Sequence, residues 1–410
     1  MLNAQTVSII KSTVPVLAEH GLEITKHFYT RMFARNPELL NIFNHANQKQ
    51  GRQQQALANA VYAAAAHIDN LGAIIPAVRL IAQKHRSLGI KPEHYPIVGE
   101  NLLAAIKEVL GDAATPEIIA AWGEAYGVIA DAFISIEAEM YAEAEGAVGG
   151  WKDFRRFVVD RKQPESDVIT SFYLVPEDGG AISSFKPGQY VSVKVNIPGA
   201  KNTMLRQYSL SCEPGKPYYR ISVKREDGSS DRPDGAVSNY LHETIKVGDV
   251  LELSAPAGEF VLDLRDTRPV VLLSGGVGLT PMVSMLNTLA AEADKGQTGR
   301  SVTFLHAAVN GNVHALREEV LAAAGRIGAN AKVRFVYQSP TDADRAAGAF
   351  DREGQIDAAY LAEQTPKDAV YYICGPVPFM KAMVQALKAN GVEDDSIRYE
   401  FFGPAGTLES

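Results

Sequence analysis

Three polar side chains, His85, Gln53 and Glu137, lie on otherwise apolar helix faces near the start of this 410-residue chain. His85 continues a stripe of apolar residues at helical spacing, and the other two each lie one turn from an apolar residue, Leu57 and Phe133. A buried carboxylate is costly unless it is paired, and a metal-ligating histidine needs an acceptor that fixes its tautomer. One cofactor would use all three side chains: a haem, with His85 on one face of the iron and Gln53 over the other.

A second interpretation of His85 stays open at this point. Its position alone favours a partly buried histidine that hydrogen-bonds to backbone, and only Gln53 and Glu137 shift the balance toward a metal ligand. The other histidines of this half are interpreted as surface or structural residues: His20, His27, His45, His67 and His94.

A second group suited to cofactor binding is the segment Arg206-Gln207-Tyr208-Ser209. An arginine, an aromatic ring and a hydroxyl within four residues can meet a phosphate, a flat ring and the polar edge of that ring. The surrounding sequence consists of short alternating segments separated by turn residues, which predicts a small antiparallel barrel. The alternative is a plain barrel without a ligand, and the 206–209 segment argues against it.

A Gly-rich turn over residues 274–281 follows a short apolar strand and precedes a predicted helix. This order places backbone N–H groups and a positive helix end at a pyrophosphate. Pro281 stands where a standard dinucleotide fingerprint has its third glycine, and no acidic residue closes the next strand, 302–306. By themselves, these residues therefore support a dinucleotide-binding fold only weakly.

Three domains are predicted to position these groups. Residues 1–147 form an all-α, haem-binding domain, residues 151–264 an antiparallel β-barrel, and residues 268–410 an α/β domain with a parallel sheet. Within the last, residues 338–355 are rich in Ser, Asp, Ala and Gly, and we expect a mobile loop there.

Composition narrows the possible functions. The net charge is −8 and no Lys/Arg-rich run occurs, which argues against nucleic acid or an anionic membrane surface as the main partner. The 2 cysteines cannot build a disulfide framework. Neither a signal peptide nor a long uninterrupted apolar segment is visible, so we expect a cytoplasmic protein without membrane insertion.

Residues 1 to about 147 resemble a bacterial globin of the flavohaemoglobin family. The matching residues are Tyr29, Phe43, Gln53, Leu57, Lys84, His85, Tyr95 and Glu137. The resemblance implies that His85 is the proximal iron ligand, that Tyr95 and Glu137 hydrogen-bond around it, and that Phe43 wedges the haem. It also implies a distal pocket formed by Tyr29, Gln53 and Leu57.

The remainder of the chain resembles the ferredoxin-reductase-like module of the same family. For FAD, the matching residues are Tyr190, Arg206, Gln207, Tyr208, Ser209, Ser238 and Asn239. For the nicotinamide nucleotide they are Gly275, Gly276, Val277, Gly278, Leu279, Thr280, Pro281, Cys374, Gly375 and Pro376. A last group implied to lie near the flavin is Glu400, Phe401, Phe402, Gly403 and Pro404. Cys374 itself is interpreted as a small buried residue without a nucleophilic role.

The resemblance implies a nitric oxide dioxygenase with haem b, FAD and NAD(P)H as cofactors, O₂ and nitric oxide as small-molecule partners, and no obligate protein partner. Two alternatives are an oxygen or nitric oxide sensor or store, and an NAD(P)H-dependent flavin or ferric reductase with a regulatory globin. An attached reductase counts against a store, which needs no continuous electron supply. We expect NADH to be favoured over NADPH, because no arginine cluster occurs at residues 307–310.

Overall fold

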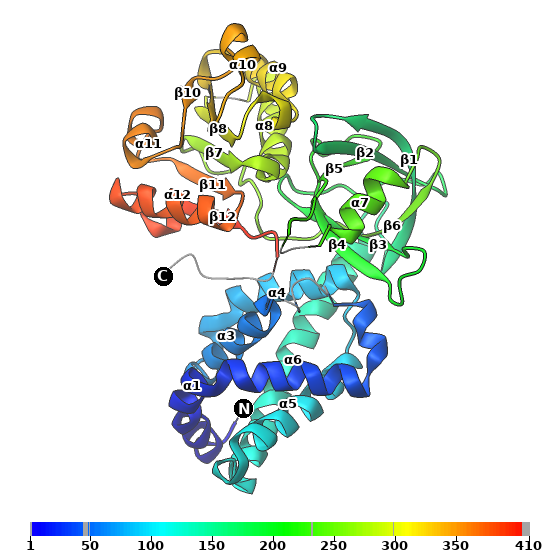
Figure 1. The fold of residues 1–410 in the computed structure, drawn as a ribbon. Coiled ribbons are helices and arrows are strands. Elements are labelled where there is room, and N and C mark those ends of the chain that lie inside the picture. Colours follow the sequence, from blue (N-terminus) through cyan, green and yellow to red (C-terminus); the bar gives the residue numbers. More distant parts are fainter. Residues whose placement is uncertain (1, 44–47, 49, 231–232, 298, 404–410) are drawn as a thin grey trace. The chain divides into compact units, whose positions relative to one another are not determined.

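The computed structural model describes residues 2–43, 48, 50–230, 233–297 and 299–403, which form two compact units. The first contains the residues up to Phe154 and the segment Lys194–Arg206. The second contains Arg155–Val193 and Gln207–Phe402, so the predicted boundary between the barrel and the α/β domain lies inside it. Figure 1 shows the two units in the colours of the sequence.

The first unit is helical, as predicted (Figure 1). Its long helices are α1 (Ala4–Arg35), α3 (Arg52–Ala66), α4 (Ile75–Leu88), α5 (His94–Leu110) and α6 (Pro116–Gly146), with 3-10 helices η1 (Pro37–Asn41), η2 (Leu71–Ile74) and η3 (Gly111–Ala113). Side-chain caps begin two of them: Asn3 accepts from the N–H of Thr6, and Thr115 from that of Ile118. Gly89 ends α4 in a left-handed conformation that suits glycine.

Helix α6 is the one helix of the described residues that is long and apolar enough to cross a membrane by length and composition. Its Ala121, Trp122 and Ala125 are buried in the core of the first unit, together with Ile10 and Phe28 of α1. These buried residues of α6 are thus used in packing against other helices of the first unit.

The barrel strands form a six-stranded antiparallel sheet in the order β4-β3-β6-β1-β2-β5. The strands are β1 (Phe154–Pro164), β2 (Ile169–Pro176), β3 (Tyr190–Val195), β4 (Met204–Ser209), β5 (Tyr219–Lys224) and β6 (Val250–Ser254), and helix α7 spans Ala236–Glu243. A bridge between Leu210 and Ile221 joins the chain after β4 to β5, the opposite edge strand. The sheet therefore curls back on itself, as a barrel does.

The α/β region contains a six-stranded sheet in the order β10-β9-β8-β7-β11-β12, with parallel pairing. The strands are β7 (Val270–Gly275), β8 (Val302–Ala308), β9 (Ala331–Tyr337), β10 (Arg352–Glu353), β11 (Val370–Cys374) and β12 (Ile397–Glu400). The helices are α8 (Leu279–Asp294), α9 (Arg317–Ile327), α10 (Asp342–Ala347), α11 (Ala358–Gln364) and α12 (Val377–Ala389), with 3-10 helices η4 (Gly276–Gly278), η5 (Gly311–Val313), η6 (Gly328–Asn330) and η7 (Asp394–Ser396). The strand order reverses between β7 and β11, and ligands of such sheets bind at the carboxyl ends of the strands there.

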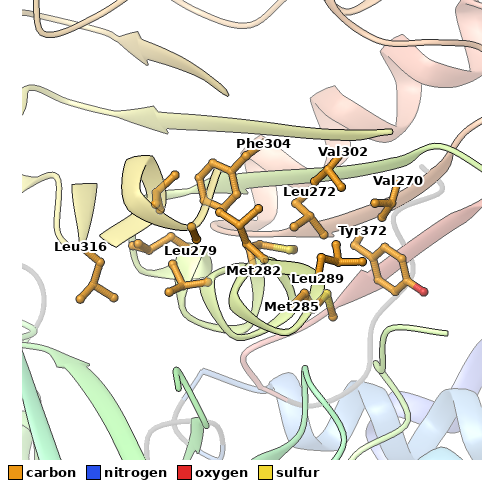
Figure 2. Packing of buried hydrophobic residues seen from close by; sticks show 14 of the residues in the cluster. Val270, Leu272, Leu279, Met282, Met285, Leu289, Val302, Phe304, Leu316 and Tyr372 are labelled. Carbon is orange, nitrogen blue, oxygen red and sulfur yellow. The ribbon is translucent and has the colours of Figure 1, made fainter. Parts of the chain in front are cut away.

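Helix α8 is buried along most of its length. Met282 and Leu289 pack on Leu272 and Phe304 of the sheet, as Figure 2 shows. Phe260, which follows the last barrel strand, belongs to the same apolar cluster. The helix therefore packs against both the sheet and the barrel.

The prediction that residues 338–355 form a loop throughout is wrong. Residues 342–347 form α10, and 352–353 form β10, which pairs with β9. A capping box begins α10: Thr341 accepts from the N–H of Asp344, and the Asp344 carboxylate accepts from the N–H of Thr341. This local signature outweighs the Ser/Asp/Ala/Gly composition.

Two histidines are buried side by side behind the Gly-rich turn. His306 of β8 and His314 are 1% and 5% exposed, and their ring centroids lie 4.6 Å apart. His306 Nδ1 lies 2.9 Å from Ser274 Oγ, and His314 Nδ1 lies 2.8 Å from Tyr337 Oη. Burial lowers the pKa of His314 to about 3 and also lowers the pKa of His306 well below its ordinary value.

These pKa values predict acid instability of the α/β region. Below the ordinary histidine pKa of 6.5, the unfolded chain binds protons that the folded chain excludes. Stability is therefore complete above pH 6.5 and falls below it, by roughly 1.4 kcal/mol per pH unit down to about pH 3 for His314, and the lowered pKa of His306 acts in the same direction. Melting followed by flavin fluorescence at pH 7.5 and 5.5 measures the loss. His314→Gln keeps a polar partner for Tyr337 and should reduce the pH dependence; an identical pH dependence in this variant would contradict the assignment.

Candidate functional site

A buried carboxylate organises the proximal side of the predicted haem site. Glu137 of α6 is 3% exposed. Its Oε1 lies 2.7 Å from Nδ1 of His85, on α4, and accepts a 2.7 Å hydrogen bond from the Tyr95 hydroxyl, on α5. The structure therefore brings together three residues from three different helices that the sequence singled out.

This arrangement determines which nitrogen of His85 is free for a metal. A carboxylate only accepts hydrogen bonds, so the His85 ring donates to Glu137 when it carries its proton on Nδ1. The Nε2 atom is then the nitrogen with a lone pair for iron. Burial, followed by the nearby Glu137 charge, raises the pKa of Tyr95 far above its ordinary value, so that Tyr95 remains a donor.

Two aromatic residues of the apolar face of α6, Tyr126 and Phe133, support this group, and neither was predicted as a site residue. The ring of Phe133 lies 5.7 Å from that of His85 and 6.3 Å from that of Tyr95. The Tyr126 hydroxyl donates to the backbone carbonyl of Tyr95 at 2.6 Å. A side chain at Gly99 would come within 2.6 Å of the Tyr126 ring, so a glycine is required there. Their spacing could have identified both residues. Phe133 lies 4 and Tyr126 lies 11 positions before Glu137, which places all three on the same face of a helix.

The predicted distal residues form a second group. Tyr29 of α1 is 5% exposed, and its phenol shares a hydrogen bond with the side chain of Gln53, on α3. Burial raises the pKa of Tyr29 well above its ordinary value of 10.0, so the phenol keeps its proton. Phe43 meets the Tyr29 ring edge-on at 5.8 Å, and Leu57 packs against the same apolar cluster.

The residues present fit a haem. The proximal group offers one histidine nitrogen backed by a carboxylate, which is the donor set of a haem iron. The distal group is aromatic and aliphatic, with one phenol and one amide as its polar members. Lys84, which precedes His85 on α4, is partly buried, and its carbonyl accepts from the Ser87 hydroxyl.

The predicted flavin residues are distributed over β3, β4 and α7. Arg206 to Ser209 end β4, where alternation places Arg206 and Tyr208 on one face and Gln207 and Ser209 on the other. Tyr190 begins β3 and is 6% exposed. The 206–209 segment thus has a charged and aromatic face on one side of the strand and a polar face on the other.

The side chains of Ser238 and Asn239 shape the start of α7. Ser238 Oγ accepts from the N–H of Glu226 and donates to the carbonyl of Gly235. Asn239 Nδ2 donates to the carbonyls of the same two residues. A side chain at Gly235 would come within 2.6 Å of Ser238 Oγ. Both predicted residues therefore hold the turn before α7 in place, and a phosphate there would meet backbone N–H groups of its first turn.

Glycines bring the two segments predicted to bind the nicotinamide nucleotide into contact at the carboxyl edge of the α/β sheet. A Cβ at Gly278 would lie 2.2 Å from the backbone oxygen of Cys374, so only glycine permits this approach. A Cβ on Gly375 would lie 3.1 Å from the backbone of Gly275, and the Phe379 ring covers both glycines. Phe379 lies in the first turn of α12 and was not selected from the sequence.

The remaining residues of the Gly-rich turn have conformations and contacts that are compatible with this close approach. Gly276 has φ +54°, and Thr280 donates to the carbonyl of Val277. Leu279 and Pro281 are buried in the first turn of α8, and Pro376 precedes α12 as its N-cap. The turn therefore presents backbone at the carboxyl end of β7, where a pyrophosphate could lie.

The last predicted group surrounds the end of β12. Glu400 is 9% exposed and pairs in register with Cys374, whose Sγ lies 3.6 Å from the Glu400 carbonyl oxygen. Burial raises the pKa of Cys374 well above its ordinary value, which agrees with a thiol that is not a nucleophile. Phe401 packs on the core while Phe402 is 47% exposed, and Gly403 follows. Pro404 lies outside the described residues.

Comparisons with known proteins agree with this architecture. Three family models match: "Globin" at residues 26–133, "Oxidoreductase FAD-binding domain" at 158–262 and "Oxidoreductase NAD-binding domain" at 272–385. Flavohemoprotein of Bacillus thuringiensis subsp. konkukian is 60% identical over 100% of both chains, and that of Bacillus subtilis is 55% identical over 100% of this chain and 99% of its own.

The chain belongs to the flavohaemoprotein family. Among solved structures, it is similar to flavohemoglobin from Malassezia yamatoensis with bound FAD and heme, at 28% identity and a TM-score of 0.84, covering 98% of this chain and 100% of that one. It is also similar to the FAD/NAD-binding domain of nitric oxide dioxygenase from Vibrio cholerae, at 42% identity and a TM-score of 0.54, over 62% of this chain and 100% of that one. As a flavohaemoprotein, the protein joins a globin to FAD- and NAD-binding oxidoreductase domains, as expected.

Replacing Glu137 by Gln tests the proximal hydrogen bonds. The amide is neutral and accepts less strongly from His85, so electron donation to the iron decreases. The iron reduction potential should become more positive, and turnover should slow by roughly 10- to 100-fold. Spectroelectrochemical titration and steady-state rates measure the two effects. Glu139→Gln, an exposed position on the same helix, is the matched control; equal potentials in both variants would rule out a proximal role for Glu137.

Proposed function

We propose that the protein is a nitric oxide dioxygenase that converts nitric oxide and O₂ to nitrate with electrons from NAD(P)H. The observation that carries this proposal is the His85–Tyr95–Glu137 group, in which a buried carboxylate lies within hydrogen-bond distance of the candidate iron ligand. Strong donation to iron favours oxygen activation over reversible storage. The name of the Vibrio cholerae neighbour supports the same activity.

Haem b, FAD and the nicotinamide nucleotide supply O₂ binding, electron splitting and hydride donation when bound. The residues of the chain bind and orient these groups. His85 would hold the iron through Nε2, while Tyr95 and Glu137 keep its ring in one tautomer. Phe43 and Leu57 would exclude water from the distal side, where Tyr29 and Gln53 are the polar groups.

The overall reaction balances with two nitric oxide and two O₂ molecules for each NADH. The products are two nitrate ions, one NAD⁺ and one proton. Two electrons from one nicotinamide thus serve two successive reactions, which is the reason for a flavin between a two-electron donor and a one-electron acceptor.

The experiment that tests this function compares NADH oxidation under O₂ with and without nitric oxide. We expect nitric oxide to accelerate NADH oxidation, with one NADH consumed for two nitric oxide molecules and nitrate as the product. A ferric or flavin reductase would oxidise NADH at a rate independent of nitric oxide. A sensor or store would bind nitric oxide or O₂ once and show no sustained NADH oxidation.

We further propose a cytoplasmic location and no obligate protein partner, because the electron donor module and the globin are parts of one chain. NADH is available in the cytoplasm, and O₂ and nitric oxide diffuse to the protein. The net charge of −8 agrees with a protein that does not bind nucleic acid.

Tyr29→Phe tests the distal donor. The phenol is buried and protonated, so it can donate to the negative charge that O₂ acquires in this pocket, and a hydrogen bond to a charged group contributes about 1.5–3 kcal/mol. The variant should release O₂ from the reduced protein about 10- to 150-fold faster in stopped-flow measurements. Tyr62→Phe, an exposed position on α3, is the control. A release rate within twofold of the parent would leave Tyr29 as a space-filling residue.

The choice between NADH and NADPH is a separate prediction. The end of β8 and the residues after it, 307–310, carry no arginine for a 2′-phosphate, and the Asp344 carboxylate accepts from the N–H of Gly311 beside them. We therefore expect kcat/KM for NADH to exceed that for NADPH. Val309, 50% exposed, offers a direct test: Val309→Arg should raise kcat/KM for NADPH. A parent enzyme that prefers NADPH would overturn this expectation.

A further inference from the structure

A buried polar network joins the FAD barrel to the α/β region within the second unit. Its central residue is Arg220 of β5, which is 4% exposed. Along β5, Tyr219, Ile221 and Val223 are buried apolar residues, and Arg220 alternates with them and points to the opposite face. A buried guanidinium in a barrel strand requires a specific set of acceptors.

Arg220 finds its acceptors on both sides of the boundary between the barrel and the α/β region. On the barrel side, its Nε donates to Ser211 Oγ at 3.0 Å and its Nη2 donates to the Ser211 carbonyl. On the other side, Nη1 and Nη2 donate to the two carboxylate oxygens of Glu319, at 2.6 and 2.8 Å. Because the pair is bidentate, it determines the orientation of the Glu319 carboxylate relative to the Arg220 guanidinium as well as the distance between them.

Glu319 connects this pair to helix α8. It lies in the first turn of α9, and its Oε1 also accepts from Asn287 Nδ2 of α8 at 2.6 Å. One turn earlier on α8, the Ser284 hydroxyl donates to the Cys212 carbonyl, directly after Ser211, at 2.6 Å. Helix α8 is thus held to one short barrel segment, 211–212, by two separate polar connections.

The position of α8 matters because the Gly-rich turn leads directly into it. Gly278 is the N-cap of α8, and the turn contacts the carboxyl end of β11 through Gly278 and Cys374. The apolar packing of α8 against Phe260 can tolerate sliding, whereas a bidentate ion pair cannot. The polar network therefore connects the barrel to the helix that begins at the Gly-rich turn.

We propose that Arg220, with Glu319 and Asn287, is a positioning residue for hydride transfer from NADH to the flavin. This inference rests on the reductive half of the proposed function and on no step that involves O₂ or nitric oxide. In that half-reaction, two electrons and one proton pass as a hydride from NADH to the flavin, leaving NAD⁺. Its rate depends steeply on the approach of the two rings, and a displacement of about 1 Å costs on the order of 100-fold.

A purely structural role is the competing explanation, and the charge pair allows the two to be separated. Glu319→Leu leaves the Arg220 charge buried without its carboxylate and should lower the Tm by about 5–10 °C. The double variant Arg220→Met/Glu319→Leu removes both charges and restores apolar packing, which is often neutral for stability. The double variant does not restore the bidentate contact between residues 220 and 319.

The experiment records anaerobic reduction of the flavin by NADH in stopped-flow for the parent, the single variant and the double variant of the full-length protein. Rates are normalised to bound FAD, and Tm is measured in parallel. We expect the double variant to recover the parent Tm within about 3 °C. Its limiting rate of flavin reduction should nevertheless stay about 10- to 100-fold low, with a weaker long-wavelength nicotinamide–flavin charge-transfer band and an NADH KM close to the parent value.

Arg326→Met/Asp294→Leu is the control, because this pair also joins α9 to α8, at 2.7 Å, but the hydrogen bonds of Arg326 go to Asp294 and not to the barrel segment 211–212. The control should leave the limiting rate unchanged. Flavin reduction that recovers together with Tm in the Arg220/Glu319 double variant would overturn the positioning role. Since nitric oxide and O₂ are absent, the result is independent of whether the protein consumes nitric oxide.

Discussion

The interaction on which the candidate site most depends is the acceptance of two hydrogen bonds by one buried carboxylate, Glu137. A carboxyl group with 3% exposure is tolerated only because His85 and Tyr95 both approach the same oxygen. Those partners come from α4 and α5, so a hydrogen-bonding requirement links three helices. The same requirement orients the His85 ring, so the packing of these helices and the orientation of the proposed iron ligand depend on one set of contacts.

The reductase half follows a different principle, in which backbone approaches backbone. Gly278 and Cys374 come so close that no side chain fits between the two segments that are predicted to bind the nucleotide. The helix that continues from this turn, α8, packs on the sheet by apolar contacts and is attached to the barrel by Ser284 and Asn287. The position of a nucleotide would thus be determined by glycines at one end of α8 and by polar contacts along it.

Sequence patterns predicted the class of each domain because periodicity reflects local burial. The stripe on α6 identified Glu137, and the strand–turn–helix order identified the Gly-rich turn. Local composition failed at residues 338–355, where the Thr341–Asp344 capping box begins a helix.

Contacts between residues far apart in the chain could not be predicted in this way. Arg220 and Glu319 are 99 positions apart, and the β5 pattern indicates only that Arg220 faces away from the apolar side. The Tyr126 contact with Gly99 and the Phe379 ring over Gly275 are likewise products of packing between elements.

The measurement that tests the account most directly is the origin of the oxygen atoms in the product. The protein, supplied with NADH, nitric oxide and ¹⁸O₂, should form nitrate in which two oxygen atoms carry the label and the third comes from nitric oxide. Both labelled atoms should derive from the same O₂ molecule, which a mixture of ¹⁶O₂ and ¹⁸O₂ reveals. Nitrate with label from water, or nitrite or nitrous oxide as the main product, would contradict a dioxygenase.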